Sequence, residues 1–236
     1  MKNEMRLNKY ISHAGICSRR EADTLIEAGT IKVNGVPITK MGYQVKEDDV
    51  VLFNGSRIHP YKTRYLLLNK PKKYCAKSRS IGKKTSVFQL IKGKCKEKVF
   101  PIDKPSNNMC GLLIFTNDQQ LSTKLSKSNR RIKKVYHLIL NKKLISIDMK
   151  KIQDKIRIDG DDSLIKNISY VDKKDKTEIG IETISNKKNI LNLIFEDLGY
   201  RVMTLDLVSY AGITKKNLPR GKSRFLAQEE VNILKR

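Results

Sequence analysis

Residues 6–35 read RLNKYISHAGICSRREADTLIEAGTIKVNG, and this stretch carries the clearest local signals in the chain. Its first part predicts a short helix that starts at Arg6 and ends near Gly15. Ser18 stands three residues before Glu21, which is the spacing of a capping box that satisfies free backbone N–H groups at a helix start. A second helix is therefore predicted from Ser18, and Gly29 is expected to end it.

The residues that follow predict a small sheet. Residues 30–33 have the composition of a strand, and Asn34-Gly35 is the strongest short hairpin signal because both residues tolerate positive φ. Residues 50–53 predict the closing strand. The first sixty residues thus predict a compact module, and we expect two domains, residues 1–60 and residues 61–236.

The stretch quoted above resembles an S4 domain, a small RNA-binding fold found in a ribosomal protein and in several RNA-modifying enzymes. Two adjacent arginines fall in the first turn of the second helix, where cations oppose the helix dipole. That placement makes more sense if RNA phosphate is the partner, although a solvated charged helix face is the alternative. By the resemblance, five residues would face RNA: Arg6, Lys9, Arg19, Arg20 and Lys32.

Positive charge is concentrated in the middle of the chain. The whole sequence has 49 basic and 24 acidic residues, for a net charge of +25. Residues 62–151 alone hold 24 basic and 4 acidic side chains, an excess of 20. A surface that follows phosphates needs such a segment. Compositional drift towards Lys and Asn is the alternative, but drift acts on the whole chain and accounts poorly for this concentration.

The rest of the chain predicts a mixed architecture. Strands are expected at residues 65–70, 111–116, 135–140 and 179–184, and a helix at residues 190–198 that Gly199 ends. Residues 72–98 predict a Lys-rich region made mostly of loops. The fold class expected is α+β with a mixed, mostly antiparallel sheet.

Four segments in this region are similar, in order, to the catalytic domain of the RsuA/RluB-type ribosomal RNA pseudouridine synthases. They are YLLLNKPK (65–72), GLLIFTND (111–118), RRIKKVYHLIL (130–140) and YAGITKKNLPRGKSRFLAQEEV (210–231). The resemblance implies an enzyme without a cofactor that flips a uridine out of the RNA stack and reattaches its uracil through carbon 5. It also implies an essential aspartate, a tyrosine against the flipped base, and a basic residue that pairs with the aspartate.

Aligned without gaps, this chain lacks both members of that ion pair. Ser106 falls at the position of the family's aspartate, and Lys104 and Met109 replace the arginine and threonine of the same motif. Asn192 and Leu193 stand where two adjacent arginines are expected on the late helix. Loss of one partner would leave a partly buried charge unpaired at a cost of a few kcal/mol, whereas loss of both does not. The pattern indicates a site released from catalysis.

Two alternatives keep the protein an enzyme. Ser106 could act as a nucleophile only with an adjacent base. The candidate base is His137, which directly follows Tyr136 of the family's K-x-Y segment, but alternation along a strand turns His137 away from the site. Asp103 could supply the carboxylate if the loop before Gly111 were three residues longer. That change would displace the carboxylate by several ångströms, where about 1 Å already matters.

The K-x-Y segment survives as Lys134 and Tyr136. Tyr136 is expected to stack on a base, and core packing is the equally weighted alternative. Four basic residues are expected to contact phosphate in this domain: Lys70, Lys72, Lys104 and Lys134.

The leading hypothesis is an RNA-binding protein of this family without catalytic activity, acting on ribosomal RNA or a ribosomal subunit precursor. An active synthase using Asp103 is the second hypothesis, and a Lys-rich nucleic-acid binder without a defined target is the third. The four cysteines have irregular spacing without a C-x-x-C pair, so we expect no metal site. With no signal peptide or apolar span, we expect a cytoplasmic monomer that binds neither cofactor nor membrane.

Overall fold

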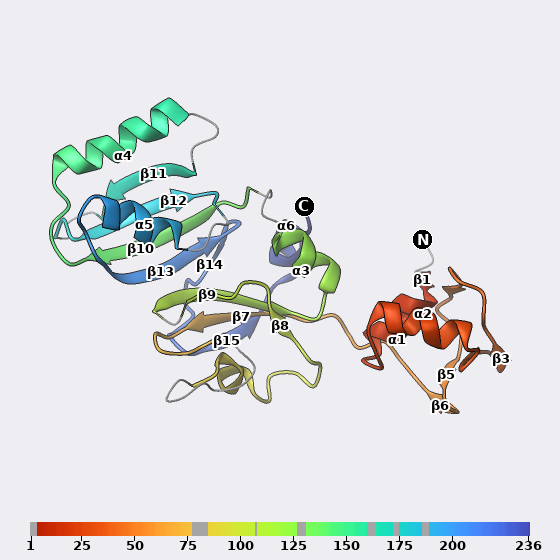
Figure 1. Ribbon diagram of the computed structural model, residues 1–236. Helices are drawn as coiled ribbons and strands as arrows, with labels where there is room; N and C mark the ends of the chain where they lie inside the picture. Colours follow the sequence, from red (N-terminus) through yellow and green to blue (C-terminus); the bar gives the residue numbers. More distant parts are fainter. Residues whose placement is uncertain are drawn as a thin grey trace. The chain divides into compact units, whose positions relative to one another are not determined.

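The computed structural model describes residues 4–76, 85–106, 108–126, 131–159, 164–171, 175–185 and 189–236, without the side chains of 155–159. The chain divides into two compact units, Met1–Lys62 and Thr63–Arg236 (Figure 1). Each is considered by itself below. None of the described helices is long and apolar enough to cross a membrane.

The first unit contains two helices and a small sheet whose strands follow the order β3-β2-β5-β6. The capping box is present, because the Ser18 hydroxyl accepts from the Glu21 N–H and the Glu21 carboxylate accepts from the Ser18 N–H. Asn34 and Gly35 both have positive φ, so the predicted turn is confirmed. The elements are β1 (Met5–Arg6), α1 (Leu7–His13), α2 (Arg19–Glu27), β2 (Ile31–Val33), β3 (Val36–Pro37), β4 (Gln44–Val45), β5 (Val51–Phe53) and β6 (Ser56–Arg57).

The second unit is built on a nine-stranded sheet with the order β11-β12-β10-β13-β9-β7-β15, to which β14 adds beside β13 and β8 beside β9. Its strands are β7 (Tyr65–Lys70), β8 (Phe100–Pro101), β9 (Met109–Thr116), β10 (Lys134–Leu140), β11 (Ile165–Tyr170), β12 (Glu178–Thr183), β13 (Val202–Tyr210), β14 (Ile213–Thr214) and β15 (Ser223–Phe225). Only β13 and β9 pair in parallel among the described strands, so the predicted α+β class with a mostly antiparallel sheet is confirmed.

Helices cover one face of this sheet, as Figure 1 shows. Apolar residues of α4 and α5 pack on β10, β11 and β12, while α3 and α6 pack on β7, β9 and β13. On the other face of β7 and β9, the segment around η1 buries a separate apolar cluster. These elements are α3 (Gln119–Ser126), α4 (Ser146–Asp159), α5 (Ile190–Asp197), α6 (Gln228–Lys235) and η1 (Val87–Ile91).

The two halves of the sheet meet where β9 runs parallel to β13. Gly111 pairs with Leu207 there and has a φ of +96°, a conformation that favours glycine. A Cβ at this position would collide with the Leu207 carbonyl oxygen and the Asp206 carboxylate. The close approach of the two strands therefore depends on the absence of a side chain at residue 111.

Candidate active site

A pocket with a volume of about 230 Å³ opens on the helix-covered face of the second unit. One wall is the loop between β8 and β9, which contributes Asp103, Lys104 and Ser106. The start of α5 also lines the pocket, together with Asn189, which immediately precedes the helix. Lys134 and Tyr136 of β10 form its floor together with Leu205, Thr183 and Ser185. The structure thus brings together the residues that the sequence assigned to the catalytic motif and to the K-x-Y segment.

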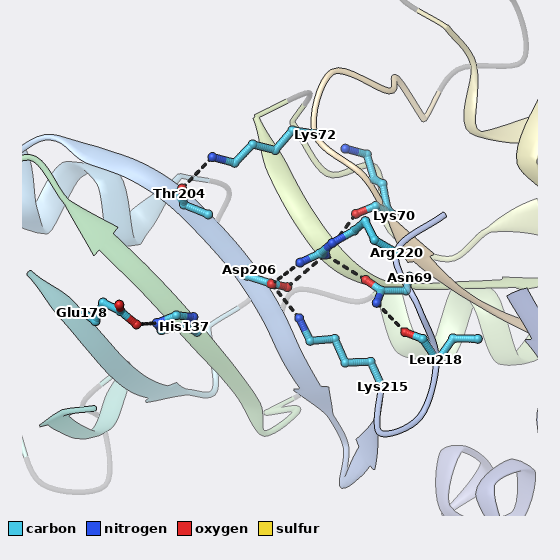
Figure 2. A network of polar contacts seen from close by, with 10 residues as sticks. All are labelled: Asn69, Lys70, Lys72, His137, Glu178, Thr204, Asp206, Lys215, Leu218 and Arg220. Atoms are coloured by element: carbon cyan, nitrogen blue, oxygen red, sulfur yellow. Dashed lines mark hydrogen bonds and ion pairs between the residues drawn. The ribbon is translucent and has the colours of Figure 1, made fainter. Parts of the chain in front are cut away.

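Strand alternation decides which side chains of β10 reach the pocket. Lys134 and Tyr136 point to the helix-covered face, and His137 points to the opposite face. There the His137 imidazole lies 2.9 Å from the Glu178 carboxylate (Figure 2). The prediction that His137 faces away from the site is confirmed, so it cannot accept a proton from Ser106.

Burial shifts the pKa of both β10 side chains on the pocket floor, Lys134 and Tyr136. Burial lowers the pKa of Lys134, and the Asp103 carboxylate, 3.9 Å from its Nζ atom, opposes that change. Burial also raises the pKa of Tyr136, and the charge of Asp103 adds to the rise. Lys134 further lies 5.4 Å from the ring centre of Tyr210. Tyr136 therefore remains a neutral phenol at physiological pH, with a cation held beside it.

The two residues aligned with the family's arginines do not line the pocket. Leu193 is 57% exposed on the outer side of α5, and Asn192 is also absent from the pocket wall. Asn189, which has a φ of 61° and precedes the helix, is the polar side chain that α5 presents to the pocket. A cation facing Ser106 from this helix would thus have to come from position 189, which sequence reasoning missed.

Lys70 does not fit the predicted role of a phosphate contact. It is only 1% exposed, and its strand position pairs with Gly111 of β9. Its Nζ atom donates to the backbone carbonyls of Met109 (2.5 Å), Pro71 (3.2 Å) and Ser106 (3.4 Å). Burial lowers the pKa of Lys70 to about 8. The ammonium group holds the backbone of the Ser106 loop from beneath instead of meeting RNA.

A second polar network lies on the face of the sheet opposite the pocket, and we call its central group the Asp206 clamp (Figure 2). Asp206 of β13 accepts from Arg220 (2.6 Å) and Lys215 (2.6 Å). Arg220 also donates to the Asn69 side chain (2.8 Å), whose amide donates to the Leu218 carbonyl (2.7 Å). The clamp therefore joins β7, β13 and the loop 215–221.

The electrostatics of the clamp favour the charged form of its carboxylate. Burial alone would raise the pKa of Asp206, but hydrogen bonds from Arg220 and Lys215 outweigh it and place the pKa below its ordinary value. The Asp206 side chain is 9% exposed, whereas Arg220 is 41% and Lys215 21% exposed. The sequence analysis assigned no role to Asp206, Lys215 or Arg220, and their sequence separations of 9 and 14 residues gave no local signal.

The remaining predicted RNA contacts are accessible to different degrees. Lys72 is exposed and donates to the Thr204 hydroxyl at 2.6 Å, and Lys104 is exposed at the pocket rim. In the first unit, Arg6, Arg20 and Lys32 are exposed, and Lys9 and Arg19 are half-buried. All five are therefore at the surface of the small unit.

Comparisons with known proteins follow the same division of the chain. The S4 domain family model matches residues 5–51, and the RNA pseudouridylate synthase family model matches residues 64–208. An "Uncharacterized RNA pseudouridine synthase" of Aquifex aeolicus is 32% identical over 97% of this chain and 92% of its own length. "Ribosomal large subunit pseudouridine synthase B" of Bacillus subtilis is 30% identical over 98% of this chain and 95% of its own.

The fold is also similar to a solved structure titled "Crystal structure of pseudouridylate synthase". The TM-score is 0.62, with 19% identity, and the match covers 98% of this chain and 99% of the other.

Proposed function

The chain belongs to the RNA pseudouridylate synthase family, and we propose that it is a member that binds ribosomal RNA without isomerising uridine. The observation that carries this proposal is Ser106 on the pocket wall, at the aligned position of the family's aspartate. A carboxylate is ionised at neutral pH and can act as a nucleophile or proton acceptor, whereas a serine hydroxyl needs a neighbouring base.

The surroundings of Ser106 argue against catalysis by its hydroxyl. His137, which is the histidine of β10, points to the other face of the sheet and is paired with Glu178. Two described amines lie near Ser106: Lys134 is held beside Asp103, and Lys70, whose Nζ atom is 3.4 Å from the Ser106 backbone carbonyl, donates to backbone carbonyls. A serine without a base does not break a glycosidic bond, and the pocket is therefore proposed to bind without reacting.

The features that would hold RNA are retained. Tyr136 offers a neutral aromatic ring on the pocket floor, and base stacking on an aromatic ring contributes about 1–3 kcal/mol. The amide of Asn189, an exposed residue that lines the pocket, provides a hydrogen-bond partner for a base. Lys72, Lys104 and the basic residues of the small unit are proposed to contact phosphates.

A second candidate function is an active synthase that uses Asp103. This residue lines the pocket, and its carboxylate lies 3.9 Å from the buried Lys134 ammonium, next to Tyr136. An acid paired with a cation beside a tyrosine is the set of groups the family's chemistry uses. The side chain of Asp103 is 44% exposed, so water would compete for it unless bound RNA covered the pocket.

Release of tritium from carbon 5 of uridine in labelled ribosomal RNA separates the two candidates. With stoichiometric pure protein, no release is expected from the unchanged chain, and no release from Asp103→Asn. Release that disappears in Asp103→Asn would overturn the proposal and establish the second candidate.

A gain-of-function variant makes the same test stronger. Ser106→Asp together with Asn189→Arg adds a carboxylate and a guanidinium to the pocket lining, and release is expected only from this double variant. Ser106→Ala with Asn189→Arg is the matched control, because it adds the cation without the acid.

Binding provides the positive side of the proposal. Affinity for ribosomal RNA should fall steeply as salt rises, since each neutralised phosphate releases counterions. An affinity that hardly changes between about 50 and 200 mM salt would contradict RNA binding through these basic residues.

A further inference from the structure

The segment that covers the outer face of β7 and β9 has an unusual charge. Residues 85–99 include η1 and bury Val87, Ile91 and Val99 against Leu68 and Phe115. In Figure 1 this segment lies across the sheet from α3 and α6. It is therefore separate from the pocket, which opens on the helix-covered face.

Four lysines of this segment are exposed, and the last three alternate with residues that face inward. Cys95 and Glu97 are half-buried and Val99 is buried, and the residues between them are exposed. The alternation places one row of cations outward along the surface of the segment. We call this row the lysine ridge; it consists of Lys92, Lys94, Lys96 and Lys98.

The ridge has almost no negative charge to balance it. Glu97 is the one acidic residue between positions 85 and 99, and its carboxylate is engaged by Arg64 at 2.8 Å. Within the described part of the chain, no ion pair joins a ridge lysine to a carboxylate. Crowded cations without counter-charge repel one another in the free protein, and a polyanion would relieve that repulsion.

Exposed aromatic rings accompany the cations. Phe100 is 47% exposed, with the Lys98 ammonium 5.8 Å from its ring centre. Phe225 is 43% exposed, and the Arg64 guanidinium lies 5.5 Å from its ring centre. Cations combined with exposed aromatic rings are typical of surfaces that follow a nucleic-acid strand, because bases stack where phosphates are neutralised.

The ridge leads directly into the pocket loop. Lys98 precedes Asp103 by five residues, so their Cα atoms are separated by at most about 17 Å. The near end of the ridge is thus within this distance of one pocket-lining residue, Asp103.

From this geometry we infer that the lysine ridge is a phosphate-contact surface for the RNA that flanks the pocket. The inference rests on the proposed RNA-binding function and adds to it a surface that is distinct from both the small unit and the pocket. It also accounts for part of the positive charge concentrated in the middle of the sequence.

Salt dependence of binding tests the ridge. The probe is a labelled hairpin transcribed from ribosomal RNA, and the variant replaces Lys92, Lys94, Lys96 and Lys98 with Gln in the full chain. The slope of log affinity against log salt should become shallower by about 3, because each lost phosphate contact removes about 0.7–0.9. Replacement of the same four residues with Arg should retain the slope.

The matched control removes an equal charge from α4 and the loop before it. Lys142, Lys143, Lys150 and Lys151 are exposed, and Lys143 and Lys151 already have carboxylate partners. Their replacement with Gln should change the slope by less than about 1. Thermal unfolding of the ridge variant should occur at the same or a higher temperature than that of the unchanged chain, which shows that it is folded.

The outcomes distinguish the inference from the function on which it rests. Equal loss of slope in both variants would mean that any removed charge suffices and would overturn the ridge. An unchanged slope in the ridge variant, with normal salt-dependent binding otherwise, would also overturn the ridge and leave RNA binding intact. An unchanged chain without salt-dependent RNA binding would overturn both.

Discussion

The pocket and the Asp206 clamp lie on opposite faces of the same strands, and they differ in which charged side chains they contain. In the clamp, a buried carboxylate keeps two cationic partners, and those partners connect three segments. In the pocket, Ser106 stands at the position that our gapless alignment gives to the family's aspartate, and Asn189, before α5, also lines the wall. Removing one charge from the clamp leaves others unpaired, whereas Ser106 and Asn189 in the pocket lining carry no charge.

The junction between β9 and β13 should be the most sensitive point of the molecule. Gly111→Ala should lower the free energy of unfolding by about 3 kcal/mol or more, because the new Cβ collides with strand β13 at a positive φ. Urea unfolding measures the change. Gly212→Ala is the control, since its φ of +86° gives similar strain with nothing within 4 Å, and it should cost about 1–2 kcal/mol. Equal losses of unfolding free energy in the two variants would mean that neighbouring atoms move and relieve the collision at residue 111.

Neutralising the clamp should have the next largest effect. Asp206→Asn keeps the size of the side chain but leaves Arg220 and Lys215 facing an amide, and it should cost about 2–3 kcal/mol. This figure lies below that of a fully buried pair because both cations are partly exposed. Asp175→Asn, in an exposed pair with Lys143, should cost less than about 0.5 kcal/mol.

The pH dependence of the free energy of unfolding tests whether the clamp stabilises the fold through the charge of Asp206. The pKa of Asp206 is lowered on folding, so its contribution is present above the unfolded pKa of about 3.9 and is lost as the pH falls through the folded value. The difference between the unchanged chain and Asp206→Asn should therefore shrink in acid. A constant difference would attribute the loss to packing.

Lys70 should produce a rise in stability with pH. Its pKa is lowered to about 8 in the folded chain and is about 10.4 when unfolded, so the unfolded state binds more protons between these values. The Lys70 contribution to the free energy of unfolding should therefore rise from pH 8 to pH 10, and the difference between the unchanged chain and Lys70→Met should change by that amount over this range. Lys216→Met, at an exposed lysine, should leave the rise unchanged. A rise that persists in Lys70→Met would assign it to another group.

Ser106→Ala should have the smallest effect, within about 0.5 kcal/mol, because the side chain is exposed at the pocket wall. Lys70 contacts its backbone carbonyl, which the substitution keeps. A cost above about 1 kcal/mol would mean that the serine hydroxyl has a structural role, and the contrast between pocket and clamp would weaken.

Local sequence signals predicted much of the fold. The helices that became α1, α2 and α5, the Asn34-Gly35 turn and the strands β2, β5, β7, β9, β10 and β12 are all present. The helices α3 and α4 and the strands β11 and β13 were not predicted. Their apolar residues are interspersed with Lys and polar residues, and they are stabilised by packing on a sheet that forms from distant segments.

The candidate site likewise contains residues that the sequence placed correctly and residues that only the tertiary structure placed. Alternation along β10 was sufficient to place Tyr136 towards the pocket and His137 away from it. Lys70 was expected to contact phosphate at the end of the strand 65–70, and the tertiary structure instead buries its ammonium group against three backbone carbonyls. The alignment assigned Asn192 and Leu193 to the lost arginines, but the direction of α5 gives Asn189 to the pocket.

The sequence by itself determined the two-part organisation, the family and the excess of positive charge, because these depend on residue identity and short-range order. The tertiary structure alone decided which lysines are buried, which carboxylate is clamped and which row of cations lacks counter-charge. These properties depend on contacts between residues far apart in the chain. Burial and pairing then decide whether a charge is a structural partner or remains available to RNA.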